Sequence, residues 1–107
     1  MDKDGFALYF SRSCIPFNRS NPELLNNPDS NKSLYYRHLG IYGYSREAIL
    51  KFSSLPQSEL EIAEQLEQLR MLQNGVKIKL EIVEKAFPAV DVPGDVKLVE
   101  NILSLKN

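Results

Sequence analysis

Hydrophobic residues in the second half of the chain change their spacing twice, and this alternation restricts the fold more than any other feature. From about residue 58 to residue 74 they recur at helical spacing, and Asn74-Gly75 is typical of a helix end. In residues 76–83 apolar and charged side chains alternate with a period of two, which predicts a half-buried strand. Beyond Pro93 the helical spacing returns and predicts a closing amphipathic helix. A chain that alternates helix and strand in this way belongs to the mixed α/β class.

The first half of the chain adds two predicted strands and a predicted helix. The aromatic-rich residues 6–10 indicate a buried strand, and residues 34–44, which alternate aromatic and aliphatic side chains, indicate a second one. Ser45 can cap the helix that follows, and Ser58 has capping-box spacing to Glu61 at the start of the next helix. We therefore expect an α/β fold in which a mixed sheet has flanking helices. Because three strands leave an edge exposed, we also expect an open flank or a partner chain.

Residues 14–33 interrupt this pattern with three prolines, many asparagine and serine residues and few apolar ones. This composition predicts a long irregular loop, and loops of this length are usually functional or mobile. The sequence of 107 residues contains 43% hydrophobic and 25% charged residues. That balance is typical of one domain with a modest core, so we expect residues 1–107 to form a single domain.

The charge and cysteine content disfavour several classes of function. A formal net charge of -1 provides no field that would favour nucleic acid or a membrane surface. No apolar stretch approaches the roughly 20 residues that cross a bilayer, and residues 1–5 lack the apolar core of a signal peptide. Cys14 is the only cysteine, which rules out an internal disulfide and fits a reducing compartment. We therefore expect a cytoplasmic protein with neither nucleic acid nor membrane as a partner.

Three polar side chains near the predicted strands are candidates for ligand binding. Arg12 follows the first strand, and its guanidinium group matches a carboxylate or phosphate, although a surface salt bridge is an equal alternative. His38 and Tyr42 lie four residues apart and would share one strand face, where they could hydrogen-bond a polyhydroxylated ligand. A lone histidine is more often structural than catalytic. Cys14 lacks the partner residues of a nucleophile and is expected to be an inert thiol.

Acidic residues form two further groups. Those in the predicted helix of residues 58–74 are most simply a solvated face, namely Glu59, Glu61, Glu64 and Glu67. Periodicity singles out neither Glu67 nor Gln68. Asp91 and Asp95 flank the start of the last helix, where a carboxylate would complement the helix dipole or hold a magnesium ion, and spacing alone favours capping. The sequence contains no glycine-rich phosphate loop, zinc-ligand cluster or nucleophile elbow.

Three longer motifs carry a more specific signal. They are YFSRSCIPF at residues 9–17, YRHLGIYGY at residues 36–44 and LEQLR at residues 66–70. In this order they resemble the 3-deoxy-manno-octulosonate (Kdo) cytidylyltransferase family, which couples the acidic sugar Kdo to CTP. The resemblance extends from about Phe6 to Leu103 and concerns only the C-terminal part of that family. It implies the C-terminal portion of a Rossmann-like nucleotide-diphospho-sugar transferase fold, which carries sugar-binding and dimerisation segments.

The resemblance implies a site for the acidic sugar. In that family the residues at the matching motif positions hold the sugar, and here they are Arg12, His38, Tyr42, Glu67 and Gln68. On this interpretation Glu67 faces a ligand rather than bulk solvent. Cys14 departs from the first motif, where proline is usual.

A magnesium ligand is implied in the same way. Residues 89–95 (AVDVPGD) are similar to a family segment whose aspartate binds the catalytic magnesium ion, which implies Asp91 here. Two positions depart from the family pattern, because alanine replaces glycine at residue 89 and Gly94 stands where an acidic residue is common. The resemblance thus makes magnesium the expected cofactor, with one further ligand aspartate missing from these residues.

The family's nucleotide-binding half has no counterpart in these 107 residues. The resemblance implies conversion of CTP and Kdo to CMP-Kdo and pyrophosphate for lipopolysaccharide synthesis, but we expect this chain to be inactive alone. It further implies a homodimer and, as a possible partner, a separate N-terminal half. The alternatives are a non-enzymatic dimerisation or interaction module, one half of a split enzyme, a decayed product, and a relative of the sialic acid cytidylyltransferases.

Overall fold

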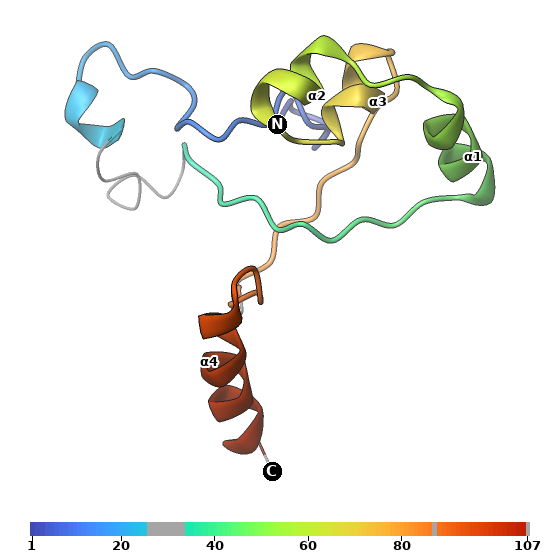
Figure 1. The fold of residues 1–107 in the computed structure, drawn as a ribbon. Helices are drawn as coiled ribbons and strands as arrows, with labels where there is room; N and C mark the ends of the chain where they lie inside the picture. Colours follow the sequence, from blue (N-terminus) through green and yellow to red (C-terminus); the bar gives the residue numbers. More distant parts are fainter. Residues whose placement is uncertain (26–33, 87, 107) are drawn as a thin grey trace.

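The computed structural model describes residues 1–25, 34–86 and 88–106. Its helices are η1 (Pro22–Leu25), α1 (Arg46–Ser54), α2 (Glu59–Glu64), α3 (Leu69–Gln73) and α4 (Pro93–Ser104). Figure 1 shows α2 and α3 beside the N-terminal segment, α1 to one side of them, and α4 well apart from all three. The radius of gyration is 16.5 Å, whereas a compact domain of about 100 residues has about 13 Å. The chain is therefore arranged openly and leaves much of its surface uncovered.

Three helix ends lie where the capping residues predicted them. Ser45 caps α1, since its hydroxyl accepts a hydrogen bond of 3.1 Å from the backbone N–H of Ala48. Pro93 occupies the first turn of α4, and Gly75, with a φ of +77°, lies just beyond the end of α3. These local signals place helix ends because a capping side chain, a proline ring or a glycine acts within one turn of the backbone.

The sequence predicted one continuous helix over residues 58–74. This prediction is wrong, because the structure divides these residues into α2 and α3. The capping box at its start is confirmed: the backbone N–H of Ser58 donates to the Glu61 carboxylate over 3.1 Å, and Ser58 Oγ accepts from the Glu61 N–H over 3.4 Å. The break follows at Gln65, whose φ of 52° and ψ of 47° are left-handed. The N–H groups of Gln65 and Leu66 both donate to the carbonyl of Glu61, a bonding pattern typical of a helix end.

The predicted mixed sheet is not confirmed. Among the residues that the structure describes, β-sheet pairing is limited to one antiparallel bridge between Phe6 and Lys79. Residues 34–44 and 76–83 therefore form no regular strand. Two backbone bonds of 2.9 Å flank this bridge, from Ala7 N–H to the Ile78 carbonyl and from Leu80 N–H to the Gly5 carbonyl. A strand needs neighbours to satisfy its backbone groups, and this part of the chain supplies only a short stretch of pairing.

The long loop predicted for residues 14–33 is described as far as residue 25. Residues 14–21 contain no helix or strand, and η1 follows them, while the remainder of the prediction lies outside the described residues. The loop contacts the residue just before the second motif, because the hydroxyl of Tyr35 donates to the carbonyl of Pro16 over 2.9 Å.

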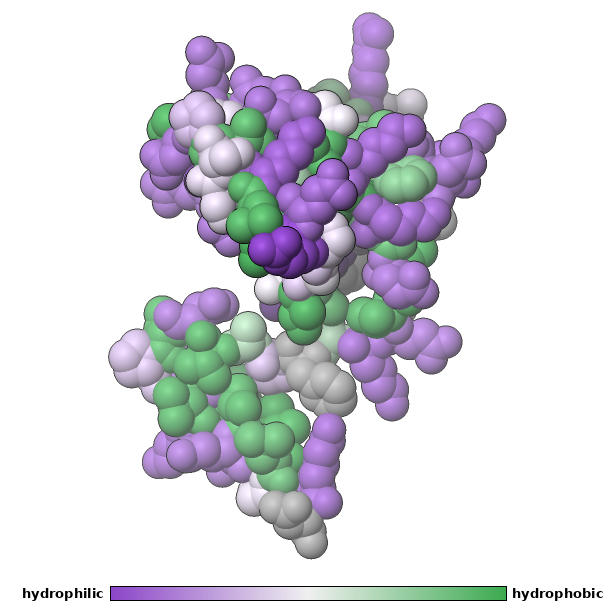
Figure 2. All heavy atoms as spheres, turned by 90° about the vertical axis from the view of Figure 1, so that its right-hand side faces the viewer, coloured by the Kyte–Doolittle hydropathy of each residue, from purple (hydrophilic) through white to green (hydrophobic). Residues whose placement is uncertain are grey.

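The hydrophobic core is small and lies between the N-terminal segment and the α2–α3 pair. It is built on Phe10, Leu66 and Leu69, of which Leu69 is completely buried. Apolar surface is plentiful elsewhere, and Figure 2 shows a green hydrophobic cluster on the lower lobe, which is α4. There Leu98 and Leu103 are 51% and 56% exposed. So much uncovered apolar surface is typical of a segment that packs against further protein.

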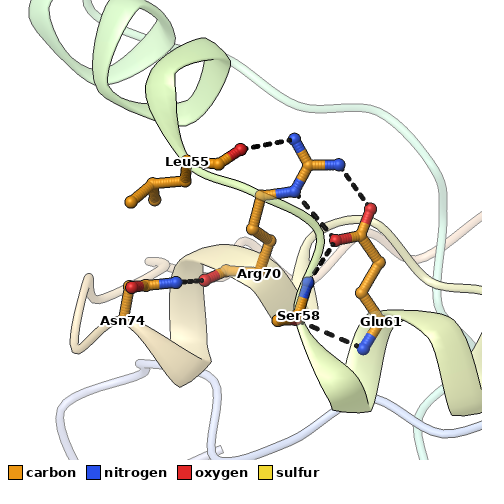
Figure 3. A network of polar contacts seen from close by, with 5 residues as sticks. All are labelled: Leu55, Ser58, Glu61, Arg70 and Asn74. Carbon is orange, nitrogen blue, oxygen red and sulfur yellow. Dashed lines mark hydrogen bonds and ion pairs between the residues drawn. The ribbon is translucent and has the colours of Figure 1, made fainter.

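A buried ion pair between Arg70 and Glu61 links α3 to α2 and to the end of α1 (Figure 3). Arg70 of α3 donates from Nε and Nη2 to the carboxylate of Glu61 over 2.8 and 2.5 Å, and from Nη1 to the carbonyl of Leu55 over 3.5 Å. Its guanidinium carbon lies 4.4 Å from the centre of the Phe52 ring of α1. The prediction that Glu61 belongs to a solvated face is therefore wrong, because only 5% of Glu61 is exposed.

Candidate functional site

An open pocket of about 580 Å³ lies between residues 38–42 and the α2–α3 region. It brings together four residues that the sequence motifs singled out, namely His38, Tyr42, Glu67 and Gln68. The sequence did not indicate two further polar residues of the lining, Gln57 and Gln65. Gln57 lies just before the capping box of α2, and Gln65 is the left-handed residue, so neither position carries a signal in the hydrophobic pattern.

His38 and Tyr42 are in direct contact, which the predicted strand would not allow, because residues four apart on a strand are separated by about 13 Å. Nε2 of His38 and the hydroxyl of Tyr42 are hydrogen-bonded to one another. The ring of Phe10 meets His38 edge-on with centroids 5.1 Å apart, and the rings of His38 and Tyr42 lie 5.8 Å apart. Because Phe10 belongs to the core, the imidazole has a fixed support on one side and the pocket on the other.

Both rings are uncharged at neutral pH. Partial burial, followed by the positive charge of Arg12, lowers the pKa of His38 from its ordinary value of 6.5. Burial, with smaller effects from Tyr44 and Glu67, raises the pKa of Tyr42 to about 12. A neutral imidazole and a phenol can each donate and accept a hydrogen bond, so the pair suits a ligand rich in hydroxyl groups.

Gln68 and Glu67 form the opposite wall of the pocket. Gln68 is only 3% exposed, and its amide nitrogen Nε2 is buried without a hydrogen-bond partner among the described residues. Buried polar groups are nearly always paired, so this unpaired donor is a group that a ligand acceptor would satisfy once the side chain turns toward the pocket that Gln68 lines. Glu67 is exposed and lines the same pocket, where its carboxylate can accept hydrogen bonds.

Arg12 lies behind this wall rather than in the pocket lining. Its Nε donates to the carbonyl of Glu64 over 3.2 Å, and its Nη2 donates to the carbonyl of Gln65 over 2.9 Å. The carboxylate of Glu64 accepts in turn from the backbone N–H of Arg12 over 2.7 Å and from the hydroxyl of Ser11 over 2.9 Å. Arg12 thus touches the end of α2, and its predicted contact with a sugar stays a prediction.

Asp91 lies outside the pocket, at the start of α4. The capping expected in this segment is made by Asp95, whose carboxylate accepts from the N–H groups of Asp91 and Val92 over 3.0 and 3.1 Å. Within the described part of the chain, no three histidine, cysteine, aspartate or glutamate side chains come together as they would around a metal ion. Asp91 can therefore offer a single carboxylate, and its magnesium role stays a prediction.

Comparison with known proteins identifies the source of these motifs. Residues 1–78 match the family model described as cytidylyltransferase. The chain belongs to this family. It is 46% identical over 103 residues to the 3-deoxy-manno-octulosonate cytidylyltransferase of Thermodesulfovibrio yellowstonii, covering 96% of this chain and 39% of that protein. It is 44% identical over 104 residues to the 8-amino-3,8-dideoxy-manno-octulosonate cytidylyltransferase of Shewanella amazonensis, covering 97% of this chain and 39% of that protein.

A solved structure agrees with these relatives. The chain superposes with a TM-score of 0.81 and 36% identity on a CMP:2-keto-3-deoxy-manno-octonic acid synthetase complexed with CTP, covering 99% of this chain and 40% of that one. The resemblance to the Kdo cytidylyltransferases is thereby confirmed, and the sialic acid alternative is not favoured. This cytidylyltransferase segment spans about 39% of the length of the relatives named above. None of its described helices is both long and apolar enough to span a membrane.

Proposed function

We propose that residues 1–107 form the sugar-binding part of a cytidylyltransferase that converts CTP and Kdo to CMP-Kdo and pyrophosphate, a precursor step of lipopolysaccharide synthesis. The observation that carries this proposal is the pocket in which His38, Tyr42, Glu67 and Gln68 meet. The names of the relatives support the sugar class, since they act on Kdo or on its 8-amino derivative.

The pocket chemistry suits an acidic sugar with many hydroxyl groups. The neutral His38–Tyr42 pair and the Glu67 carboxylate provide donors and acceptors for hydroxyl groups. The amide of Gln68 provides a donor that has no competing partner among the described residues. The charge of Arg12 reaches the pocket, because it contributes to the lowered pKa of His38, and it would offset the negative charge of a sugar carboxylate.

The nucleotide and metal parts of the reaction need groups beyond this pocket. In the proposed enzyme Asp91 would contribute one carboxylate to a magnesium ion, which when bound would offset negative charge on the CTP phosphates. The described residues do not gather a second and third ligand around Asp91, so they do not by themselves fit the ion. The part played by this segment is to bind and orient the sugar hydroxyl that attacks the nucleotide.

The fold of the active protein is the second part of the proposal. A hollow of about 1230 Å³ runs along residues 34–45 and 76–84, lined mainly by apolar side chains. Ile41 and Ile82 of these segments are 87% and 60% exposed. We propose that both segments become strands of a mixed α/β sheet, as parts of one domain, when paired with the remaining part of a cytidylyltransferase or with a second copy in a homodimer. A non-enzymatic interaction module would use the same surface, and a cytoplasmic location stays a prediction.

Pyrophosphate release from CTP and Kdo in the presence of magnesium tests the proposed function. The 107-residue chain alone is expected to give no release above background. A chimera in which it replaces the matched segment of the Thermodesulfovibrio yellowstonii enzyme is expected to be active, because the chimera unites the sugar pocket with the nucleotide site. The same enzyme without the matched segment is the control. A chimera that folds, as judged by circular dichroism, yet releases no pyrophosphate would contradict the proposal.

A further inference from the structure

The break between α2 and α3 is held in an unfavourable backbone conformation. Gln65 has a φ of 52°, while the other described residues with positive φ are the glycines Gly5 and Gly75. A residue with a Cβ atom loses free energy in the left-handed region, and glycine does not. The hydrophobic spacing of residues 58–74 also favours a continuous helix. Tertiary contacts must therefore hold the break open against both local preferences.

These contacts come from Ser11 and Arg12 and converge on Glu64, and we call the three residues the Glu64 clamp. In a continuous helix the carbonyls of Glu64 and Gln65 would accept from the N–H groups four residues later. Here they accept instead from Nε and Nη2 of Arg12, over 3.2 and 2.9 Å. The Glu64 carboxylate anchors this arrangement by accepting from the backbone N–H of Arg12 over 2.7 Å and from Ser11 Oγ over 2.9 Å. The clamp thus occupies the acceptors that helix continuation would use.

The break also determines the shape of the pocket. Four consecutive residues, Gln65, Leu66, Glu67 and Gln68, all line it. On an α-helix four consecutive side chains point around almost the whole circumference, because successive residues are rotated by about 100°. They can line one pocket only while this stretch is not helical. If α2 continued into α3, Glu67 and Gln68 could no longer both face the ligand.

We infer that Glu64 is a positioning residue for sugar binding: through Ser11 and Arg12 it keeps Gln65 left-handed, and so keeps Glu67 and Gln68 in the pocket wall. This inference rests on the proposed function for its ligand, but the conformational part does not depend on it. Glu64 itself does not line the pocket, so its effect is transmitted through the backbone.

The test compares Glu64→Ala with the double variant Glu64→Ala/Gln65→Gly. The φ angle of residue 65 is followed by NMR, helix content by circular dichroism, and Kdo affinity by titration. Glu64→Ala is expected to shift residue 65 to the right-handed region, raise helix content and weaken Kdo binding about tenfold, in line with the cost of the left-handed conformation. Adding Gln65→Gly is expected to restore the left-handed residue, because glycine adopts it without a clamp. The double variant is expected to bind Kdo as tightly as the single variant Gln65→Gly, which is the reference because Gln65 lines the pocket.

Glu59→Ala, an exposed glutamate on the same helix, is the matched control and is expected to change none of the three readouts. The inference is overturned if residue 65 stays left-handed in Glu64→Ala, or if Glu64→Ala still weakens Kdo binding when it is added to Gln65→Gly. If the unmodified chain binds no Kdo, the proposed function fails, while the φ angle and helix content still decide whether the clamp exists.

Discussion

Replacing Arg70 with methionine is expected to lower the unfolding temperature of the chain by about 10 °C. Arg70 donates to both carboxylate oxygens of Glu61 and to the carbonyl of Leu55, and so joins α3 to α2 and to the end of α1 (Figure 3). The pair is largely buried, with side-chain exposures of 15% for Arg70 and 6% for Glu61. Methionine fills similar space but leaves the buried Glu61 carboxylate without its cation, which is the costly outcome.

Thermal unfolding followed by circular dichroism measures this effect, and two further variants interpret it. Arg46→Met replaces an exposed arginine at the start of α1 and is expected to change the midpoint by less than about 2 °C. The double variant Glu61→Leu/Arg70→Met is expected to regain part of the loss, because no unpaired charge remains. A midpoint for Arg70→Met equal to that of the unmodified chain would show that the ion pair does not hold the helices together.

Replacing Gln68 with methionine is expected to stabilise the free chain while removing sugar binding. The buried Nε2 of Gln68 has no partner among the described residues, and such a group costs about 1 kcal/mol or more. Methionine has similar length and no polar atom to leave unpaired, so the unfolding midpoint is expected to rise by about 5 °C. Loss of the donor is expected to weaken Kdo binding about thirtyfold, the equivalent of one or two hydrogen bonds.

The opposite signs of the two effects separate this account from simple damage to the fold. Gln57→Met is the matched control for stability, since Gln57 is exposed at the same pocket and carries no buried unpaired nitrogen. It is expected to leave the midpoint unchanged. A Gln68→Met variant that melts earlier and still binds Kdo as the unmodified chain does would mean that the amide serves the fold and not the ligand.

Local signals in the sequence predicted the helix ends, but the sheet depended on partners that the described residues do not supply. Ser45 and Pro93 mark the starts of α1 and α4, because capping acts within one turn. The alternation in residues 76–83 reports which side chains avoid water, but it does not report whether a neighbouring strand is present. Only the bridge between Phe6 and Lys79 forms in this part of the structure.

The break at Gln65 could not be predicted from periodicity, because Arg12, more than fifty residues earlier, occupies the carbonyls that would continue the helix. Glu67 was assigned to a solvated face because the sequence pattern predicted one continuous helix through residue 65. The spacing of His38 and Tyr42 placed both on one face of a predicted strand, but no strand forms there and their hydrogen bond was not predicted. Glu67 and Gln68 were singled out only by the motif that surrounds them. The role of Arg12 at the end of α2 had no signal in the sequence, since it arises from contacts made in the folded chain.

The most direct test of the central claim is a titration of Kdo into the isotope-labelled 107-residue chain, followed by NMR. The account predicts saturable shifts at millimolar sugar for the signals of His38, Tyr42, Glu67 and Gln68, which line one pocket, and weaker shifts with sialic acid. The signals of α4, which lies apart from the pocket, are expected to stay in place. Unchanged pocket signals, or shifts confined to α4, would contradict the claim that this segment binds the sugar.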